Sequence, residues 1–338
     1  MDCLLVALLA FNHCPEDDDR LFRNDGGVAI SADGNLIVYG RDRNAFVWDR
    51  QKNKVRRLVV DVEGGVAACR INGSSNRIVV SVSKYSIGSG SLLLFDRNAK
   101  RLRKHVAQIA HDPKPIGFLS TPERVYRGVE AWNLATGERT NLLSEPRRPR
   151  GGLGASVYPL PNGYLVTGQR IPGEGPLEPA PGMFVSYIFE GYATDYSLAG
   201  TERRKWLCEA LESADFVSPV GKSDLLAIGH SSACVISAEG KEEKCFEIEN
   251  GERMRPTRYR GWVLVTNGER ACLKDAATGN LIAELASTRA DKIVDVAVSP
   301  KSETLVTLRG NGFVQLWNTK SGQEIDHRWI RAGTKVRN

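Results

Sequence analysis

The stretch GNGFVQLWNTKSGQEI, from Gly310 to Ile325, combines a short alternating apolar segment, a tryptophan and a polar turn that contains glycine. A similar stretch, DRNAFVWDRQKNKV, runs from Asp42 to Val55. Alternating apolar residues bounded by turn-forming residues are typical of a β-strand that enters a tight turn. The occurrence of the same unit near both ends of the chain predicts a fold built from repeats.

Seven segments of this kind occur along the chain, each with one anchor residue at the end of its apolar part. Successive anchors recur at intervals of about 40 residues, the period of a propeller repeat, except for one longer step between Trp132 and Tyr196. Each unit contains four short apolar runs, which predicts four antiparallel strands in each, the composition of a β-propeller blade. The anchors are Trp48, Phe95, Trp132, Tyr196, Ile236, Lys274 and Trp317.

The sequence therefore predicts an all-β protein, a seven-bladed β-propeller of four-stranded antiparallel blades that occupies residues 1–338 as one domain. Residues 4–11 form an apolar segment that we expect to close the ring, since an unpaired apolar strand is an aggregation-prone edge. Alternatively, residues 323–330 complete the last blade. The approximate blades are residues 26–62, 63–110, 111–145, 150–212, 213–250, 251–289 and 290–330.

The segments from Ile30 to Asp49 and from Val298 to Asn318 resemble the WD40 repeat family, and GVEAWNLATGE resembles it more weakly. The resemblance implies that Asp42 and Asn311, each six residues before a tryptophan, occupy the place of a buried, hydrogen-bonding aspartate. It also implies a protein-interaction module with structural aromatic residues at the anchor positions. The sequence departs from the family because no unit opens with a Gly-His pair and units four to six lack the tryptophan. The structural residues expected on this basis are Asp42, Trp48, Phe95, Trp132, Asn311 and Trp317.

A rival resemblance is to quinoprotein-type propeller repeats, which KDAATGNLIAEL matches through its Asp-x-x-Thr-Gly pattern. The adjacent cysteine pair of such dehydrogenases is missing. The Gly-Lys-Ser triplet that begins at Gly221 lacks the first glycine of a phosphate-binding loop, and the five histidines form no HExxH motif. No G-x-S-x-G motif is present. We therefore predict no cofactor, no metal and no enzymatic activity. A propeller enzyme, either a hydrolase or a quinoprotein, ranks third, after the two binding functions given below.

The composition is that of an ordinary globular protein, with 41% hydrophobic and 25% charged residues and a net charge of +6. The seven cysteines are scattered without a CxxC pair, so we expect mostly buried, reduced thiols and a cytoplasmic location. Secretion is the alternative, because the segment from Cys3 to Phe11 is apolar. Its nine residues are too few to cross a bilayer, which takes about 20, so we predict no membrane insertion.

The long fourth unit contains the segment RIPGEGPLEPAPGMF between its second and third strands, and basic runs lie before it and in the sixth unit. Proline-rich segments favour an extended conformation suited to docking, and arginine and tyrosine are common interface anchors. We expect these residues to share one propeller face, and a further run from Arg97 to Lys104 to protect an outer strand edge. The predicted partner-binding residues are Arg147, Arg148, Arg150, Arg170, Pro172, Glu174, Leu177, Pro179, Phe184, Arg253, Arg255, Arg258, Tyr259 and Arg260.

The sequence thus favours a non-enzymatic scaffold or recognition subunit that binds other proteins of a multi-subunit assembly through one face. The alternative is a propeller that binds RNA or ribonucleoprotein through its arginine-rich loops, because arginine pairs with phosphates and tyrosine stacks on bases.

Overall fold

A computed structural model describes most of the chain between Gly26 and Trp329, some strand residues by their backbone alone. Residues 1–25, 142–152, 171–189 and 330–338 lie outside the described part. Shorter gaps are residues 63, 75, 84–88, 109–115, 121–122, 128–129, 161–162, 198–201, 212–213, 215, 221–223, 230–231, 250–251, 258–260, 268–270, 286–291 and 300.

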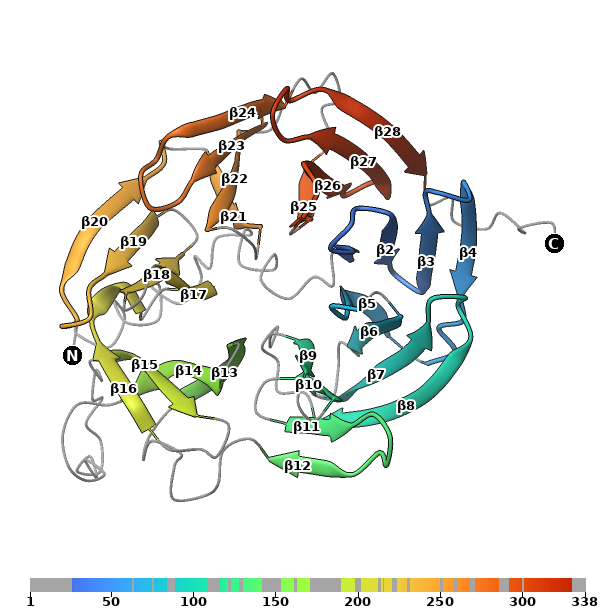
Figure 1. Cartoon of the computed structure of the whole chain (residues 1–338), viewed down its shortest axis with the longest axis horizontal. Coiled ribbons are helices and arrows are strands. Elements are labelled where there is room, and N and C mark those ends of the chain that lie inside the picture. The colour runs from blue at the N-terminus through green and yellow to red at the C-terminus, as the bar shows by residue number, and fades with distance from the viewer. Residues whose placement is uncertain are drawn as a thin grey trace, which may run out of the picture.

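Seven four-stranded antiparallel sheets, each formed by consecutive strands, are arranged around a central axis (Figure 1). This confirms the predicted seven-bladed propeller. The blades comprise β1 (Gly27–Ile30), β2 (Leu36–Arg41), β3 (Asn44–Asp49) and β4 (Lys54–Leu58); β5 (Gly65–Ile71), β6 (Arg77–Ser83), β7 (Ser89–Asp96) and β8 (Arg101–Gln108); β9 (Ile116–Ser120), β10 (Glu123–Arg127), β11 (Glu130–Asn133) and β12 (Arg139–Asn141); β13 (Leu153–Leu160), β14 (Gly163–Arg170), β15 (Glu190–Ser197) and β16 (Glu202–Leu207); β17 (Phe216–Val220), β18 (Asp224–Ile228), β19 (Ser232–Ile236) and β20 (Glu242–Glu247); β21 (Arg253–Pro256), β22 (Trp262–Thr266), β23 (Ala271–Asp275) and β24 (Leu281–Leu285); and β25 (Ile293–Val298), β26 (Thr304–Arg309), β27 (Phe313–Asn318) and β28 (Glu324–Trp329).

One short 3₁₀ helix, η3 (Glu209–Leu211), lies between the fourth and fifth blades. Within the described residues, no helix is long and apolar enough to cross a membrane.

The seven anchor residues all lie on the third strand of their blades, from Trp48 on β3 to Trp317 on β27. Trp48, Phe95, Trp132 and Trp317 are buried. The second and third strands are buried on both faces because each sheet packs against two neighbouring sheets. Strands of this kind are near-continuous apolar runs, as in β26. The outer strands lie at the rim, in contact with solvent, which explains why β4 and β28 contain several exposed residues.

The hydrophobic core lies between successive blades. One cluster joins the first two blades through side chains such as Val47, Leu58, Leu93 and Phe95. Further clusters join the sixth and seventh blades and, at the ring junction, the seventh and first blades. Each fully buried aliphatic or aromatic side chain contributes about 1.5–3 kcal/mol, so this packing between sheets holds the ring together.

The ring junction between the last and first blades is also held by polar contacts, and Figure 1 shows these blades side by side. The backbone N–H of Val28 donates to Asp295 Oδ2 over 2.9 Å. Ser299 Oγ and the backbone N–H of Lys301 both donate to the carbonyl of Ala32, over 2.7 and 3.0 Å. These bonds join residues far apart in the sequence.

On the outer side of the junction, Arg328 of β28 reaches the first blade. Its Nη2 donates to Asn53 Oδ1 over 2.7 Å, and its guanidinium lies 4.2 Å from the centre of the Trp48 ring. The last blade has β28 as its own fourth strand. Residues 4–11 lie outside the described part, so their role as a closing strand stays a prediction.

The structure corrects the roles that the resemblance implied for Asp42 and Asn311. Asp42 has a φ of 51° in the turn between β2 and β3, and 74% of its side chain is exposed. Asn311 is also exposed, and its Oδ1 accepts a hydrogen bond from the backbone N–H of Phe313 over 2.9 Å. Both residues therefore act in tight turns, where Asp and Asn tolerate special backbone geometry, and neither is a buried hydrogen-bonding residue.

The first and seventh blades, whose sequences best resemble WD40 repeats, differ in the hydrogen bonding of their tryptophan indole nitrogens. Trp317 Nε1 donates to the buried hydroxyl of Thr307 over 3.0 Å. Trp48 Nε1 is buried and has no hydrogen-bond partner among the described residues. The position on β2 that corresponds to Thr307 holds Tyr39, whose burial raises the pKa of its phenol.

One cysteine departs from the expectation of reduced thiols. Cys69, Cys208 and Cys272 are free, but Cys234 on β19 is disulfide-bonded, and Cys245 lies directly opposite it in the ladder with β20. Disulfides persist in oxidising compartments. Cysteine usage therefore no longer supports a reducing compartment.

Candidate interaction surfaces

The order of the strands defines two faces of the ring. Connections from the second to the third strand and from blade to blade lie on one face, here called the entry face. Connections from the first to the second strand and from the third to the fourth strand lie on the other, here called the turn face. Binding residues concentrate on such loops because the sheets hold them rigidly.

Two of the predicted residues mark the entry face. Arg170 is the last residue of β14, opposite Glu190 of β15, and Arg253 is the first residue of β21. Of the other predicted residues, Arg147, Arg148, Arg150, Pro172, Glu174, Leu177, Pro179 and Phe184 lie outside the described residues.

The described part of the second basic run begins at the entry face. Arg253 and Arg255 lie in β21, which runs from the entry face toward the turn face. At its far end the backbone N–H of Thr257 donates to the carbonyl of Trp262, and that of Ala276 donates to the carbonyl of Gly261. That the whole run shares one face stays a prediction. Arg258, Tyr259 and Arg260, between these described positions, lie outside the described residues.

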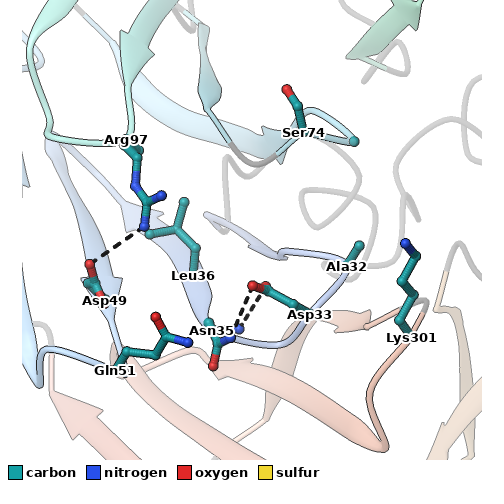
Figure 2. A pocket seen from close by; sticks show the side chains of 10 residues that line it. Ala32, Asp33, Asn35, Leu36, Asp49, Gln51, Ser74, Arg97 and Lys301 are labelled. Atoms are coloured by element: carbon teal, nitrogen blue, oxygen red, sulfur yellow. Dashed lines mark hydrogen bonds and ion pairs between the residues drawn. The ribbon is translucent and has the colours of Figure 1, made fainter.

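A polar cavity of about 290 Å³ opens on the turn face, where the seventh, first and second blades meet (Figure 2). It is built from the connections between the first and second strands of all three blades and from the third-to-fourth turns of the first and second blades. Its lining residues are Ala32, Asp33, Asn35, Leu36, Asp49, Gln51, Gly73, Ser74, Arg97 and Lys301.

Asp33 supplies a fixed carboxylate to this cavity. It accepts hydrogen bonds from Ser31 Oγ at 2.5 Å, from the backbone N–H of Asn35 at 3.1 Å and from Asn35 Nδ2 at 3.0 Å. Burial raises the pKa of Asp33, but the hydrogen bonds from Ser31 and Asn35 outweigh it and lower the pKa below its usual value. The carboxylate is therefore ionised at neutral pH.

A second carboxylate, Asp49 at the end of β3, is almost fully buried and joins the turns of two blades. It accepts a hydrogen bond from the backbone N–H of Lys52 over 3.1 Å. Arg97 Nη2, from the second blade, lies 3.9 Å from Asp49 Oδ2 (Figure 2). This separation exceeds a hydrogen bond, so the half-exposed guanidinium keeps donors for a ligand.

The exposed side chains of Gln51 and Lys301 also line the cavity (Figure 2). Lys301 uses only its backbone N–H at the ring junction, and its ammonium has no ion pair among the described residues. The cavity therefore combines carboxylate acceptors with guanidinium, ammonium and amide donors. This set suits a polypeptide segment, which carries both donors and acceptors in its backbone.

The lining residues do not form a catalytic arrangement. Ser74 of the lining donates through its hydroxyl to Asn76 Oδ1 over 2.8 Å and accepts from Asn72 Nδ2 over 2.8 Å. Both partners are amides, so no base activates this hydroxyl as a nucleophile. Across the described part of the chain, no three His, Cys, Asp or Glu side chains are grouped to hold a metal ion.

Sequence reasoning did not find this cavity. Its signal is present in two matching turns, SADGN from Ser31 to Asn35 and SPKSE from Ser299 to Glu303. Each turn is unremarkable by itself, because Asp, Asn and Ser are ordinary turn residues. Only the ring junction brings the two turns together.

Comparison with known proteins supports the fold. No protein-family model and no curated protein matches the sequence. Among solved structures, the computationally designed Ika8 protein is 13% identical, with a TM-score of 0.51 over 90% of this chain and 87% of that chain. The C-terminal WD40 domain of Sif2 is 14% identical, with a TM-score of 0.52 over 86% and 80% of the two chains.

At these identities the similarity concerns the fold alone. The seven sheets define the chain as a β-propeller, and its blades have the WD40-like arrangement of four antiparallel strands.

Proposed function

We propose that this protein is a non-enzymatic scaffold or recognition subunit that binds a segment of a partner protein in the polar cavity of the turn face. The supporting observation is the cavity itself, which loops of three blades build with carboxylate acceptors and with guanidinium, ammonium and amide donors. The fold agrees with this role, because propellers with WD40-like blades commonly serve as interaction platforms. Arg97 and Lys301 would bind carboxylate or carbonyl groups, and Asp33 would accept backbone or side-chain donors.

The entry face is the second location for the same function. Arg170 and Arg253 mark it within the described structure, and the other predicted residues, among them Arg147, Arg148 and Arg150, are proposed to lie near them. Assembly into a multi-subunit complex is part of the proposal. The cysteines no longer support a cytoplasmic location, because Cys234 is disulfide-bonded.

Affinity capture from native lysate, with mass spectrometry and RNA sequencing, tests the function and the face together. A turn-face variant carries Arg97→Glu, Lys301→Glu and Gln51→Ala. An entry-face variant carries Arg147→Glu, Arg148→Glu and Arg150→Glu and lacks residues 171–183. Each variant is the control for the other, and circular dichroism checks that both remain folded.

We expect a set of proteins to be lost from the turn-face variant and retained by the entry-face variant. The opposite pattern would keep the scaffold function and move it to the entry face. Loss of RNA instead of protein would replace the proposal with RNA binding, and an unchanged set of captured proteins in both variants would contradict it.

A further inference from the structure

The outer strands of the first two blades and of the last three blades carry charge of opposite sign. β4 and β8, in the first two blades, carry six basic residues and no acidic residue. β20, β24 and β28, in the last three blades, carry six acidic residues and two basic ones. The small net charge of the whole chain therefore conceals a strongly basic sector. The six basic residues, which we name the basic rim, are Lys54, Arg56, Arg57, Arg101, Arg103 and Lys104.

Few of these charges are neutralised within the described part of the chain. Arg101 forms an ion pair with Asp61, which lowers the pKa of that carboxyl. Arg57 donates to the amide oxygen of Asn44, and Arg103 donates to the carbonyl of Ala135. The side chains of Lys54, Arg56 and Lys104 form no ion pair among the described residues. The rim thus retains charge that a ligand can use.

The ion pair between Arg101 and Asp61 also shows that the first blade meets β8 at this rim, although Arg103 lies on the other side of β8, toward the third blade. Asp61 belongs to the connection that follows β4, and Arg101 begins β8, so the connection of the first blade lies against the outer strand of the second. In the β7–β8 ladder, Lys104 lies opposite Leu93, whose side chain packs toward the first blade. Lys104 therefore lies on the side of β8 that faces β4.

Two exposed aliphatic residues lie within this basic sector. Val59 follows β4 directly and is 58% exposed. Leu102 is 39% exposed because the ladder between β7 and β8 shifts there, pairing Phe95 with Arg101 and Leu94 with Arg103 and leaving Leu102 without an opposite residue. Apolar side chains among free cations suit a ligand that is both acidic and partly apolar.

Protection of strand edges does not by itself explain the charge pattern. Any charged side chain on an outer strand discourages pairing between sheets, and the acidic residues of β20 and β28 do this in the last blades. Basic residues on the outer strands of two adjacent blades repel one another, and the protection of strand edges does not require this repulsion. A complementary ligand would relieve that repulsion.

The chemistry of the basic rim favours a protein ligand over a nucleic acid. Single-stranded nucleic acids bind through aromatic side chains that stack on bases as well as through cations. The large apolar side chains exposed in the described parts of the first two blades are aliphatic, and the exposed Trp329 belongs to the last blade. β8 is eight residues long and ends its sheet, so its outer edge, which pairs with no strand in the described part of the chain, can also pair with an extended peptide.

We propose that the basic rim binds an extended acidic segment of a partner protein, with Val59 and Leu102 contacting its apolar side chains. This surface runs along the circumference of the ring, so it adds a binding surface beyond the two faces and does not depend on the function of the cavity.

Fluorescence anisotropy with purified full-length protein tests the proposal. The probe is a labelled synthetic peptide of about eight residues, the length of β8, with Glu and Asp at most positions and Leu and Val between them. A peptide with Lys at the acidic positions and a single-stranded RNA of equal charge serve as comparison ligands. The rim variant is Arg56→Glu with Lys104→Glu, because neither side chain has an ion pair within the described structure.

A matched control variant carries Lys205→Glu and Lys241→Glu, which change the net charge equally at exposed positions of the fourth and fifth blades, where neither side chain has an ion pair within the described structure. We expect the acidic peptide to bind the wild type and the control variant, and the rim variant to bind at least about tenfold more weakly. Leu102→Ser should weaken binding by a smaller factor, and added salt should weaken it further.

Equal losses in the rim and control variants would overturn the proposal, since the effect would then come from net charge. No binding of the acidic peptide to the wild type would also overturn it. Tighter binding of the RNA, lost in the rim variant, would assign the surface to nucleic acid and contradict a protein partner.

Discussion

His105 is a buried residue whose chemistry depends on its surroundings in the ring. It lies on β8, is 8% exposed, and its ring stacks on Trp132 of the third blade with 5.6 Å between the centres. Its Nε2 has no hydrogen-bond partner among the described residues. Burial lowers the pKa of the imidazole, and the positive charge of Arg103 lowers it further. The folded protein therefore holds His105 neutral at neutral pH.

This lowered pKa predicts a loss of stability in mild acid. An unfolded chain has a histidine pKa of about 6.5, so below that pH the unfolded state binds more protons than the folded state. The contribution of His105 is complete above this pH and is lost as the pH falls toward its folded pKa. His105→Phe keeps an aromatic ring against Trp132 and removes the titration. Melting temperatures measured between about pH 7 and pH 5 should fall more steeply for the wild type than for the variant. Parallel curves would show that His105 does not titrate on unfolding.

At the scale of the secondary-structure elements, the turn between β27 and β28 packs closely against β24 of the sixth blade. Gly322, between β27 and β28, has a φ of 68° and its backbone N–H donates to the carbonyl of Asn318 over 2.9 Å. A Cβ at this position would lie 1.8 Å from the carbonyl oxygen of Glu284 on β24. Glycine is therefore required both by the backbone conformation and by the neighbouring strand.

Gly322→Ala should therefore lower the free energy of unfolding by about 2–4 kcal/mol, because it combines backbone strain with displacement of β24. Gly73→Ala is the matched control, since a Cβ at Gly73 would meet no atom within 4 Å. Urea unfolding followed by tryptophan fluorescence compares the two midpoints. Equal midpoints for the two variants would show that β24 can shift without any loss of folding stability.

At the scale of the whole molecule, the ring junction joins the two ends of the described chain. Asp295 accepts the backbone N–H of Val28, a bond that spans 267 residues of sequence. β1 is the innermost strand of its blade, and a Cβ at Gly27 would lie 2.6 Å from Ala68 Cα on β5. The first blade is thus held closely between the second blade and the seventh.

Asp295→Ala should lower stability by about 1.5–3 kcal/mol, the range for a hydrogen bond to a charged group. Asp295→Asn keeps an acceptor oxygen and should recover part of this loss. Hydrogen exchange of the Val28 amide should accelerate most in the alanine variant. An unchanged exchange rate at Val28 would mean that the packing of the seventh blade on the first closes the ring without this bond.

The architecture was largely predictable because a blade is a local structure. Four consecutive strands pair with their neighbours in sequence, so alternation, turn residues and the spacing from Trp48 to Trp317 were sufficient to predict seven units. Asp42 shows where this reasoning failed. Its spacing from Trp48 matched a family pattern, but the two-residue turn between β2 and β3 needs a residue that tolerates positive φ, and the side chain points to solvent.

The candidate sites were less predictable. The basic run from Arg253 to Arg260 was predicted as one patch, and of its arginines the structure describes Arg253 and Arg255, which lie along β21. Only the part of the basic rim in the run from Arg97 to Lys104 was noticed in the sequence, and the sign contrast with the last blades required the assignment of outer strands.

By itself the sequence determined the repeat, the four strands of each blade and the anchor residues on the third strands, because pairing within a blade depends on residues close together in the chain. Only the tertiary structure decided which blades touch at the junction and which turns line the cavity. Ring closure sets the first blade beside the seventh, and this brings Asp33 and Lys301 to one cavity although nearly the whole chain separates them. No local pattern specifies that contact, because it arises from the packing of seven similar units around one axis.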